Sequence, residues 1–287
     1  MTLSTIKPRL ISRSPKTRAA EQRGLTMIEL LIALGLGVFL LAGILQVFVG
    51  SRQSFEVIHA QSSMQEAGRF SMAMMGAELR QTGYMNIGTI TATNGDTMAQ
   101  QLANIVDGES MMEEKWPDSG NFDAGAAVYG QTDAAGFAGN DAKGNSEFVA
   151  FRVQGDPDLN MTDCAGNAMP TGTADIVEMS FYVDTNEQLR CRTGNTDSIL
   201  VSGVEHMKVQ YGLTAATLPP AAVSYVDADS VADWSDVVTV RLGILTVSDN
   251  SPLDDSEVDY DLLGEEFTYS EGRARQVFTQ TIFLRNR

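Results

Sequence analysis

Few residues in this chain have the types and spacing that catalysis or metal binding requires. Its two histidines, His59 and His206, are far apart in sequence, and neither stands in a metal-ligand spacing. The chain also lacks a nucleophile elbow, a phosphate-binding loop and a dinucleotide-binding fingerprint. We therefore expect no catalytic, cofactor-binding or metal-binding residue, and we interpret both histidines as surface or packing residues. The sequence does not predict an enzyme.

Two acidic segments raise the question of calcium binding. Asp156, Asp158 and Asn160 alternate as at the start of a calcium loop, but the glycine and the glutamate that such a loop needs further on are missing. A solvated turn is the better interpretation. The run 249–261 is likewise interpreted as a solvated loop. Its acidic residues include Asp254, Asp255, Glu257 and Asp259.

The two cysteines, Cys164 and Cys191, have no CxxC spacing and no histidine cluster beside them. In an oxidising compartment such a pair is typical of one disulfide. The bond would close a loop of nearly thirty residues and contribute about 3–4 kcal/mol in the chain-entropy model. Two buried free thiols are the alternative.

Glu29 is the one charged residue in an apolar run from Leu25 to Gly50. As a helix the run would be roughly 39 Å long, more than the ~30 Å hydrocarbon core of a bilayer requires. A carboxylate inside such a span costs about 2.5–3.5 kcal/mol and by default marks a function. The run is too long for a cleaved secretory signal. A plain signal anchor fits its length but leaves Glu29 unexplained.

Charge is unevenly distributed along the chain. The formal net charge is −17, and residues 1–24 carry six basic residues against Glu21, so the remainder carries −22. The basic N-terminus is expected to stay cytoplasmic while the rest is exported. A segment this acidic repels the phosphates of nucleic acids. We therefore expect no direct binding of nucleic acid.

The string from Arg23 to Glu29, RGLTMIE, resembles the processing site of type IV prepilins. The resemblance implies cleavage between Gly24 and Leu25 by a dedicated peptidase, and N-methylation of Leu25. Residues 1–24 would then be a cleaved basic leader, and Glu29 the fifth mature residue. The new α-amine, with a reference pKa of about 7.7–8.0, would be largely protonated at neutral pH. In pilins the implied partner of the glutamate is this amine on a neighbouring subunit, which makes Glu29 an assembly charge.

We expect residues 25–50 to form the apolar half of a long helix and residues 51–83 to form an amphipathic second half. A stripe of apolar residues at spacings of three and four would cover a sheet, or alternatively pair with a partner helix. Its members are Val57, Ala60, Met64, Ala67, Phe70, Met74 and Ala77. The same segment resembles the PilW family of minor pilins, whose "GRF…DLR..GY" pattern is matched by Gly68–Phe70, Glu78–Arg80 and Gly83–Tyr84, with Glu78 replacing the usual aspartate.

The rest, residues 84–287, is expected to be a β-rich periplasmic domain. Alternating or β-branched runs predict strands without intervening helices, and therefore a largely antiparallel sheet. The predicted strands are 147–153, 176–183, 205–211, 237–247 and 276–284. The segment 86–145 has weak periodicity and is expected to consist of loops with short elements. One long helix packed on such a sheet is an α+β fold, and it is the pilin architecture.

The resemblance to PilW extends through this domain. The family's "DC.G", "FYV…L.C", "V.GVE…VQYG" and terminal strand patterns are matched by segments of this chain. The segments are 163–166, 181–191, 201–212, 234–242 and 284–287. This match also implies that Cys164 pairs with Cys191.

The resemblance implies a minor pilin that helps to prime assembly of a type IV pilus and lies at its tip, supporting adhesion and twitching motility. Implied partners are other minor pilins, the major pilin, prepilin peptidase, a tip adhesin and the inner-membrane assembly platform. The protein would be a single-pass inner-membrane protein before assembly and part of the pilus afterwards. The alternatives are a pseudopilin of a type II secretion system and, from a different class, a membrane-anchored periplasmic enzyme.

Overall fold

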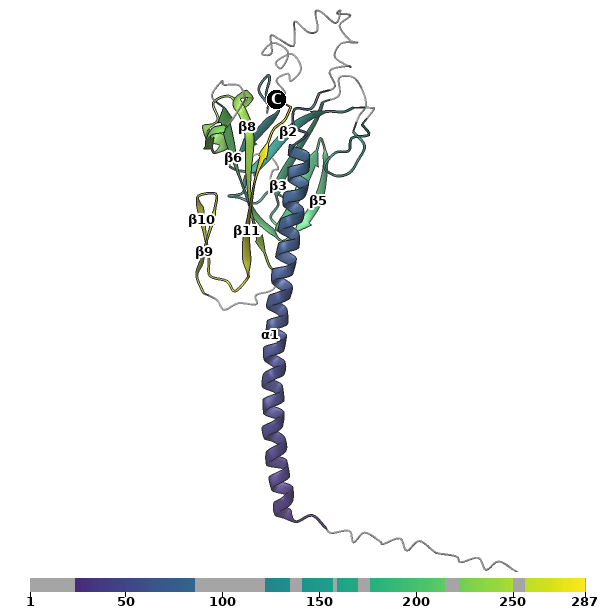
Figure 1. The fold of residues 1–287 in the computed structure, drawn as a ribbon, viewed down its shortest axis with the longest axis vertical. Coiled ribbons are helices and arrows are strands. Elements are labelled where there is room, and N and C mark those ends of the chain that lie inside the picture. Colours follow the sequence, from purple (N-terminus) through teal and green to yellow (C-terminus); the bar gives the residue numbers. More distant parts are fainter. Residues whose placement is uncertain are drawn as a thin grey trace, which may run out of the picture. The chain divides into compact units, whose positions relative to one another are not determined.

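The computed structural model describes residues 24–85, 122–134, 141–156, 159–169, 176–214, 222–249 and 256–286. The chain divides into two compact units, residues 1–52 and 53–287. One long helix, α1 (Met27–Leu79), begins in the first unit and ends in the second (Figure 1). It ends a few residues before the expected limit at residue 83, and residues 80–83 form a turn instead.

A five-stranded sheet in the order β1-β2-β3-β4-β5 makes up one layer of the second unit. Every neighbouring pair in it is antiparallel. Its strands are β1 (Val128–Gln131), β2 (Phe148–Gln154), β3 (Ile176–Val183), β4 (Gln188–Thr193) and β5 (Thr196–Ser202).

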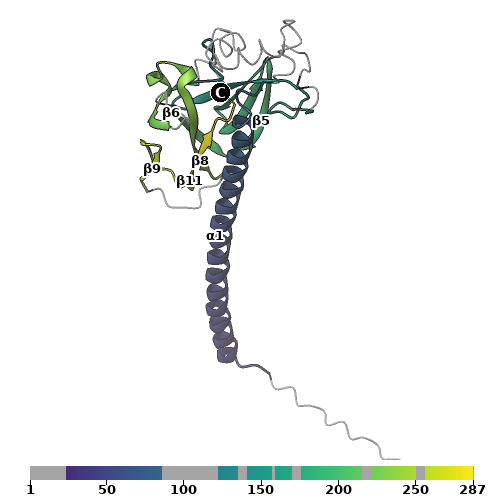
Figure 2. The same ribbon diagram turned by 45° about the horizontal axis from the view of Figure 1, so that its top comes forward.

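A four-stranded antiparallel sheet has the order β11-β8-β6-β7, and β9 pairs with β10 as a separate hairpin (Figure 2). The strands of the sheet are β6 (Val204–Thr214), β7 (Ala222–Val226), β8 (Val237–Val247) and β11 (Arg275–Phe283). Those of the hairpin are β9 (Val258–Leu262) and β10 (Glu265–Tyr269). Two 3-10 turns, η2 (Ala228–Ser230) and η3 (Trp234–Asp236), connect β7 to β8.

The α+β fold class and the antiparallel pairing are confirmed, but the strands form two sheets and a hairpin rather than one sheet. Strands 176–183 and 237–247 have the predicted bounds, and the other three predicted strands shift or lengthen by up to three residues at an end. The segment 86–145 contains β1, whereas its residues 86–121 and 135–140 lie outside the described part of the chain. The two sheets share one core with the end of α1, to which Phe151, Phe181 and Leu242 belong.

The face of α1 that packs on the body is not the predicted apolar stripe. Ala60 and Met64 are buried as expected, but Val57, Phe70 and Ala77 are exposed. The buried residues are Ala60, Met64, Gly68, Ser71, Met72, Met75, Gly76 and Leu79. Several of them are small because β11 lies alongside this part of the helix in both ribbon views.

Two glycines show how close this approach is. A Cβ at Gly68 would lie 2.2 Å from the ring of Phe278, and one at Gly76 would lie 3.1 Å from Oε1 of Gln280. The helix therefore covers the edge strand β11, which protects that edge from pairing with another chain. Hydrophobicity alone predicts that the face with Phe70 packs on the body. The face with Gly68 and Gly76 packs there instead, because these glycines let β11 come close to the helix.

The Gly83–Tyr84 pair joins the end of α1 to the sheet. Gly83 adopts a φ of +75°, and a Cβ there would lie 2.0 Å from the carbonyl oxygen of Asn286. Its N–H donates to the carbonyl of Arg152 over 2.9 Å. The hydroxyl of Tyr84 donates to Asp156 Oδ2 over 2.6 Å. A side chain at position 83 would thus both strain the backbone and displace the C-terminal segment.

Candidate functional site

The residues expected to form the processing site lie at the start of α1. Gly24 and Leu25 precede the helix in non-helical conformation, and Leu25 is 75% exposed. A Cβ added to Gly24 would meet no atom within 4 Å. The rest of the expected leader, residues 1–23, lies outside the described residues. Nothing in the described fold therefore requires a glycine at position 24.

Glu29 lies in the first turn of α1 and contacts Thr26. The Thr26 N–H and hydroxyl donate to Glu29 Oε2 over 3.4 and 3.3 Å. This is the reciprocal half of a capping box, in which a glutamate three residues into the helix accepts from the backbone of the capping residue. The helix N-terminus also favours a negative charge there. No basic side chain of the described residues forms an ion pair with Glu29.

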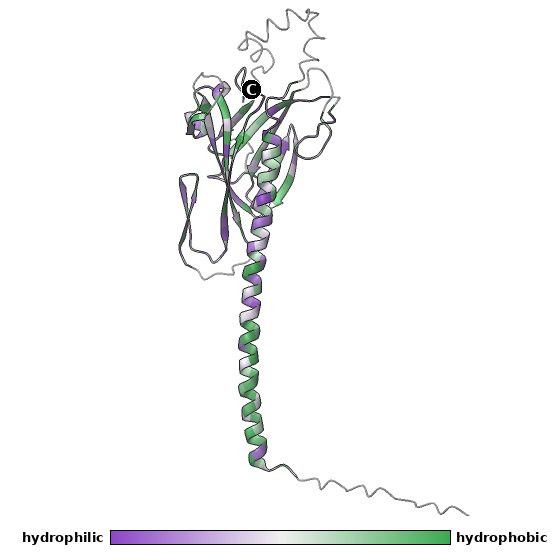
Figure 3. Cartoon of the chain, in the orientation of Figure 1, coloured by the Kyte–Doolittle hydropathy of each residue, from purple (hydrophilic) through white to green (hydrophobic). Residues whose placement is uncertain are grey.

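The first half of α1 is mainly hydrophobic (Figure 3), and Glu29 is the charged residue in its first turn. The most apolar stretch of this helix is not buried in the described structure. The helix is long and apolar enough to cross a membrane, which is compatible with the expected anchor. Such a surface is stable only when lipid or other helices cover it.

Cys164 and Cys191 form a disulfide, with Cα atoms 6.1 Å apart. Cys191 lies in β4, and Cys164 lies in the loop between β2 and β3. The loop is shaped by Asp163, whose Oδ1 accepts from the N–H groups of Ala165 and Asn167 over 2.9 and 2.8 Å. The "DC.G" pattern thus has a physical basis, because the aspartate closes the turn that presents the cysteine to the sheet.

Replacing both cysteines with serine is expected to lower the free energy of unfolding by about 3–4 kcal/mol. The bond closes a sequence separation of 27 residues and restricts the unfolded chain. Thermal denaturation of the full chain with and without reductant measures the effect. Reductant should destabilise the parent protein and leave the double variant unchanged; equal stability of oxidised and reduced parent protein would contradict the prediction.

A second cluster, the Lys208 cluster, was not identified from the sequence. The Lys208 ammonium lies 3.1 Å from Glu147 Oε1, 3.1 Å from Glu265 Oε2 and 3.7 Å from Asp227 Oδ1. Glu147 also accepts a hydrogen bond from the N–H of Val209 over 2.5 Å. Burial raises the pKa of Glu147 to about 7, although Lys208 and that backbone bond oppose the shift. The cluster connects both sheets with the β9–β10 hairpin.

The hairpin bears on two predictions. His206, interpreted from the sequence as a surface or packing residue, is a packing residue. It and Lys208 are buried, at 6% and 9% exposure, because the hairpin covers their face of β6. The His206 ring packs against Phe267 with centroids 4.5 Å apart, and burial lowers the pKa of its imidazole. The acidic run was interpreted as a solvated loop, yet Asp259 and Asp261 belong to β9.

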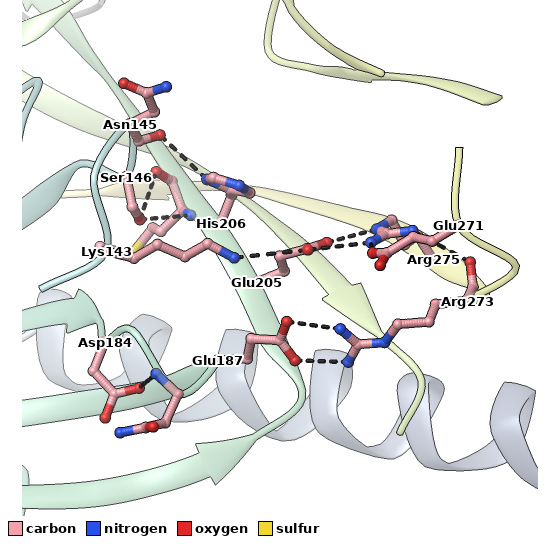
Figure 4. Close-up of polar contacts among 12 residues, drawn as sticks. Lys143, Asn145, Ser146, Asp184, Glu187, Glu205, His206, Glu271, Arg273 and Arg275 are labelled. Atoms are coloured by element: carbon pink, nitrogen blue, oxygen red, sulfur yellow. Dashed lines mark hydrogen bonds and ion pairs between the residues drawn. The ribbon is translucent and has the colours of Figure 1, made fainter. Parts of the chain in front are cut away.

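A network of ion pairs links the turn between β3 and β4 to the start of β11 (Figure 4). Arg273 binds both oxygens of Glu187, over 2.8 and 2.6 Å. Arg275 binds both oxygens of Glu205, over 2.6 and 3.2 Å. The hydrogen bonds from Arg273 lower the pKa of the Glu187 carboxyl. Bidentate pairs of this kind fix geometry. The Arg273–Glu187 pair joins the two sheets, whereas the Arg275–Glu205 pair joins β11 to β6 within the four-stranded sheet.

The remaining candidate residues are not brought together in a catalytic arrangement. His59 lies on α1, exposed, beside Phe55. Asp156 is buried and accepts from Tyr84, and Asp158 lies outside the described residues. Within the described ranges, no group of three or more histidine, cysteine or acidic residues could hold a metal ion.

Glu78 is a half-buried glutamate. The family resemblance noted it only because it replaces the usual aspartate. Its Oε2 atom is buried without a hydrogen-bond partner among the described residues. Burial raises the pKa of Glu78 to about 7, with a smaller contribution from the charge of Asp163. The folded protein therefore binds this proton more tightly than the unfolded chain does, so the contribution to stability grows as the pH falls from about 7 towards 4.5.

Replacing Glu78 with glutamine is expected to raise the melting temperature at pH 8, because it removes a buried charge without removing the side chain's volume. The difference from the parent protein should shrink as the pH falls through 7. Thermal denaturation across this range measures it, with Glu66→Gln, an exposed site on the same helix, as the control. A difference between parent and Glu78→Gln that does not change with pH would contradict the prediction.

An apolar N-terminal helix that continues into a disulfide-bonded antiparallel β body defines a pilin-like α+β protein. Residues 148–286 match the model of the PilW family, described as type IV pilus-assembly protein W. The resemblance to this family is thereby confirmed over those residues, and the match supports a type IV pilus-related pilin. The Gly68–Tyr84 motifs lie outside the matched range.

Among solved structures, a type IV-like pilin, TTHA1219 from Thermus thermophilus, is similar to this chain. The sequence identity is 14% and the TM-score 0.33, and the similarity covers 56% of this chain and 84% of that one. No curated protein sequence matches the chain.

Proposed function

We propose that this chain is a minor pilin, a structural subunit that helps to prime assembly of a type IV pilus and lies at its tip. The observation that carries the proposal is the start of α1, where Gly24 occupies open space and Glu29 sits in an apolar surface that nothing in the described fold covers. The fold of the single chain does not require a glycine at position 24, and it uses the Glu29 carboxylate only as a helix cap with Thr26. Both are explained by partners: a peptidase that reads the glycine and a neighbouring subunit that receives the carboxylate.

In this proposal, prepilin peptidase cleaves between Gly24 and Leu25 and Leu25 is methylated. The freed helix leaves the inner membrane and inserts among the helices of other minor pilins and the major pilin, with the β body exposed. The assembly platform and a tip adhesin are further partners. Adhesion and twitching motility follow from the pilus, and the subunit itself performs no catalysis.

The test is the N-terminal sequence and intact mass of the protein isolated from membranes of cells with and without prepilin peptidase. A mature N-terminus at Leu25 bearing one methyl group, found only with the peptidase, is the expected result. Gly24→Val should block cleavage, whereas Gly35→Val should not, although both glycines occupy open space in the described residues. An uncut N-terminus in cells with the peptidase would refute the pilin function. Loss of pili in a deletion strain then tests the priming role, because a pseudopilin would leave pili intact.

A further inference from the structure

The β9–β10 hairpin lies as a separate layer on the face of the four-stranded sheet that points away from the core. Residues of β6 alternate between the two faces: Met207, Val209 and Tyr211 belong to the core, whereas His206, Lys208 and Gln210 contact the hairpin. No described strand of either sheet pairs with the hairpin. Side-chain contacts therefore hold it in place, among them the packing of Leu262 and Leu263 on Gly243 of β8.

The inward side chains of β10 form a row of contacts with basic residues of the sheet. The contacts are Glu265 with Lys208 at 3.1 Å, the ring of Phe267 with the ring of His206 at 4.5 Å, and the ring of Tyr269 with the guanidinium of Arg275 at 3.5 Å. Lysine and arginine stay charged at neutral and mildly acidic pH, whereas histidine titrates between about pH 5 and 8. The contact of His206 is thus the one of these three that changes with pH in that range.

The surroundings of His206 disfavour a proton on its imidazole while the hairpin is in place. The ring is buried, and its Nδ1 atom lies 3.2 Å from the carbonyl oxygen of Asn145 (Figure 4). Burial and the charge of Lys143, in the loop before β2, lower the pKa of the imidazole. Glu205 on β6, the Asn145 carbonyl and Glu265 on β10 oppose that shift without cancelling it.

The lowered pKa of His206 links the position of the hairpin to protons. The neighbour of His206 on β8 is Leu245, which carries no charge, and Lys208 further along β6 is paired with its own carboxylates. A ring uncovered by the hairpin would bind a proton with an ordinary pKa of about 6.5. The contribution of His206 to holding the hairpin is therefore complete above about pH 6.5 and is lost as the pH falls below it.

We propose that the β9–β10 hairpin is a pH-dependent cover of the four-stranded sheet, which loosens in mildly acidic surroundings when His206 takes up a proton. Loosening replaces a surface that carries the exposed carboxylates of Asp259 and Asp261 with one that carries the cations of His206 and Lys208. This surface is separate from the apolar helix that the proposed assembly uses, so the inference does not depend on cleavage at Gly24.

Hydrogen–deuterium exchange of the full chain in detergent, read by mass spectrometry on peptides from residues 256–270, tests the proposal. Exchange times are adjusted for the intrinsic effect of pH on amide exchange. Between about pH 7.5 and about pH 5.5, opening of the parent hairpin should increase severalfold, up to the roughly tenfold that one proton with a pKa of about 6.5 allows. Peptides from β3 and β8 should keep their protection.

His206→Phe keeps an aromatic ring against Phe267 but carries no proton, so its hairpin should lose most of this pH response. His59→Phe, at an exposed position on α1, is the control and should behave as the parent protein does. Lys143→Met retains His206 and should weaken the response, because it removes a charge that lowers the pKa of the imidazole. Acid also protonates Glu147, whose pKa is raised to about 7, but Glu147 is the same in every variant. Differences from the parent protein therefore report on His206.

Three results would each overturn the proposal. An equal pH response in the parent and His206→Phe hairpins would show that His206 is not the trigger. Protection of the hairpin that rises in acid would show that the protonated ring is held more firmly against Phe267, as a cation on an aromatic face. Parallel loss of protection in β3 and β8 would show unfolding of the whole β body instead of movement of the hairpin.

Discussion

Replacement of Lys208 with methionine is expected to lower the free energy of unfolding by about 3–5 kcal/mol, the usual cost of breaking a buried ion pair from one side. Lys208 is the cation of a cluster with three carboxylates, on Glu147, Asp227 and Glu265. Methionine keeps much of the side chain's volume, so the loss reports on charge rather than on a cavity. The carboxylates left behind would repel one another in a partly desolvated site. Chemical denaturation of the two full-length proteins at pH 8 measures the difference.

The control for Lys208→Met is Lys143→Met, which removes a partly exposed lysine 3.6 Å from Glu205. Glu205 keeps Arg275, so this substitution should cost less than about 1 kcal/mol. The loss in Lys208→Met should also shrink below pH 7, because burial raises the pKa of Glu147 to about 7 and protonation removes part of the repulsion. Equal losses in the two lysine variants would contradict the proposed importance of the cluster.

The strands that could be predicted are those whose own side chains are apolar enough to indicate a buried strand. β3 and β8 have β-branched or aromatic side chains at most positions and are buried along nearly their full length. β4 and β5 were missed because their polar side chains are satisfied by partners that a local pattern does not reveal. Arg190, for example, pairs with Asp184 and Asp197. From the sequence alone, a charged residue is interpreted as solvent-exposed, because its ion-pair partner cannot be identified.

The predictions for the β9–β10 hairpin and for the packed face of α1 were wrong for a related reason. In β9 the acidic residues Asp259 and Asp261 are exposed while Leu262 is buried, so the alternation was present but was outweighed by charge. On α1, Gly68 marks the contact face because its neighbour is the ring of Phe278. Such contacts depend on how distant segments meet, and hydrophobic periodicity contains no information about that.

The start of α1 presents the opposite case. Here the sequence motif predicts a role for Gly24 and Glu29, whereas the fold of a single chain does not reveal one. The described fold does not require a glycine at position 24. The described structure gives Glu29 a capping contact with Thr26 alone. A capping contact of this type stabilises a helix by roughly 0.5–2 kcal/mol, which is no more than the cost of a carboxylate in an apolar span, about 2.5–3.5 kcal/mol. In the proposed assembly, the α-amine of a neighbouring subunit supplies the remaining stabilisation of the carboxylate.

Replacement of Glu29 with glutamine is therefore expected to leave the subunit folded, inserted and cleaved after Gly24, but to reduce its incorporation into pili roughly a hundredfold or more. The estimate follows from the 3–5 kcal/mol cost of leaving one member of a buried ion pair without its partner, here the α-amine of a neighbouring subunit, at about 1.4 kcal/mol per tenfold change. Glutamine keeps the size of the side chain and can still accept from Thr26, so helix capping is little affected.

Immunoblots of sheared pili and of membranes, from cells carrying each variant, measure incorporation against the membrane pool. Glu56→Gln is the matched control, because Glu56 is an exposed glutamate on the same helix beyond the apolar run. The parent and Glu56→Gln subunits should appear in both fractions, and Glu29→Gln in the membrane fraction alone. If Glu29→Gln entered pili as well as the control did, the carboxylate would serve only as a helix cap, and the amine of a neighbouring subunit would have no role in docking.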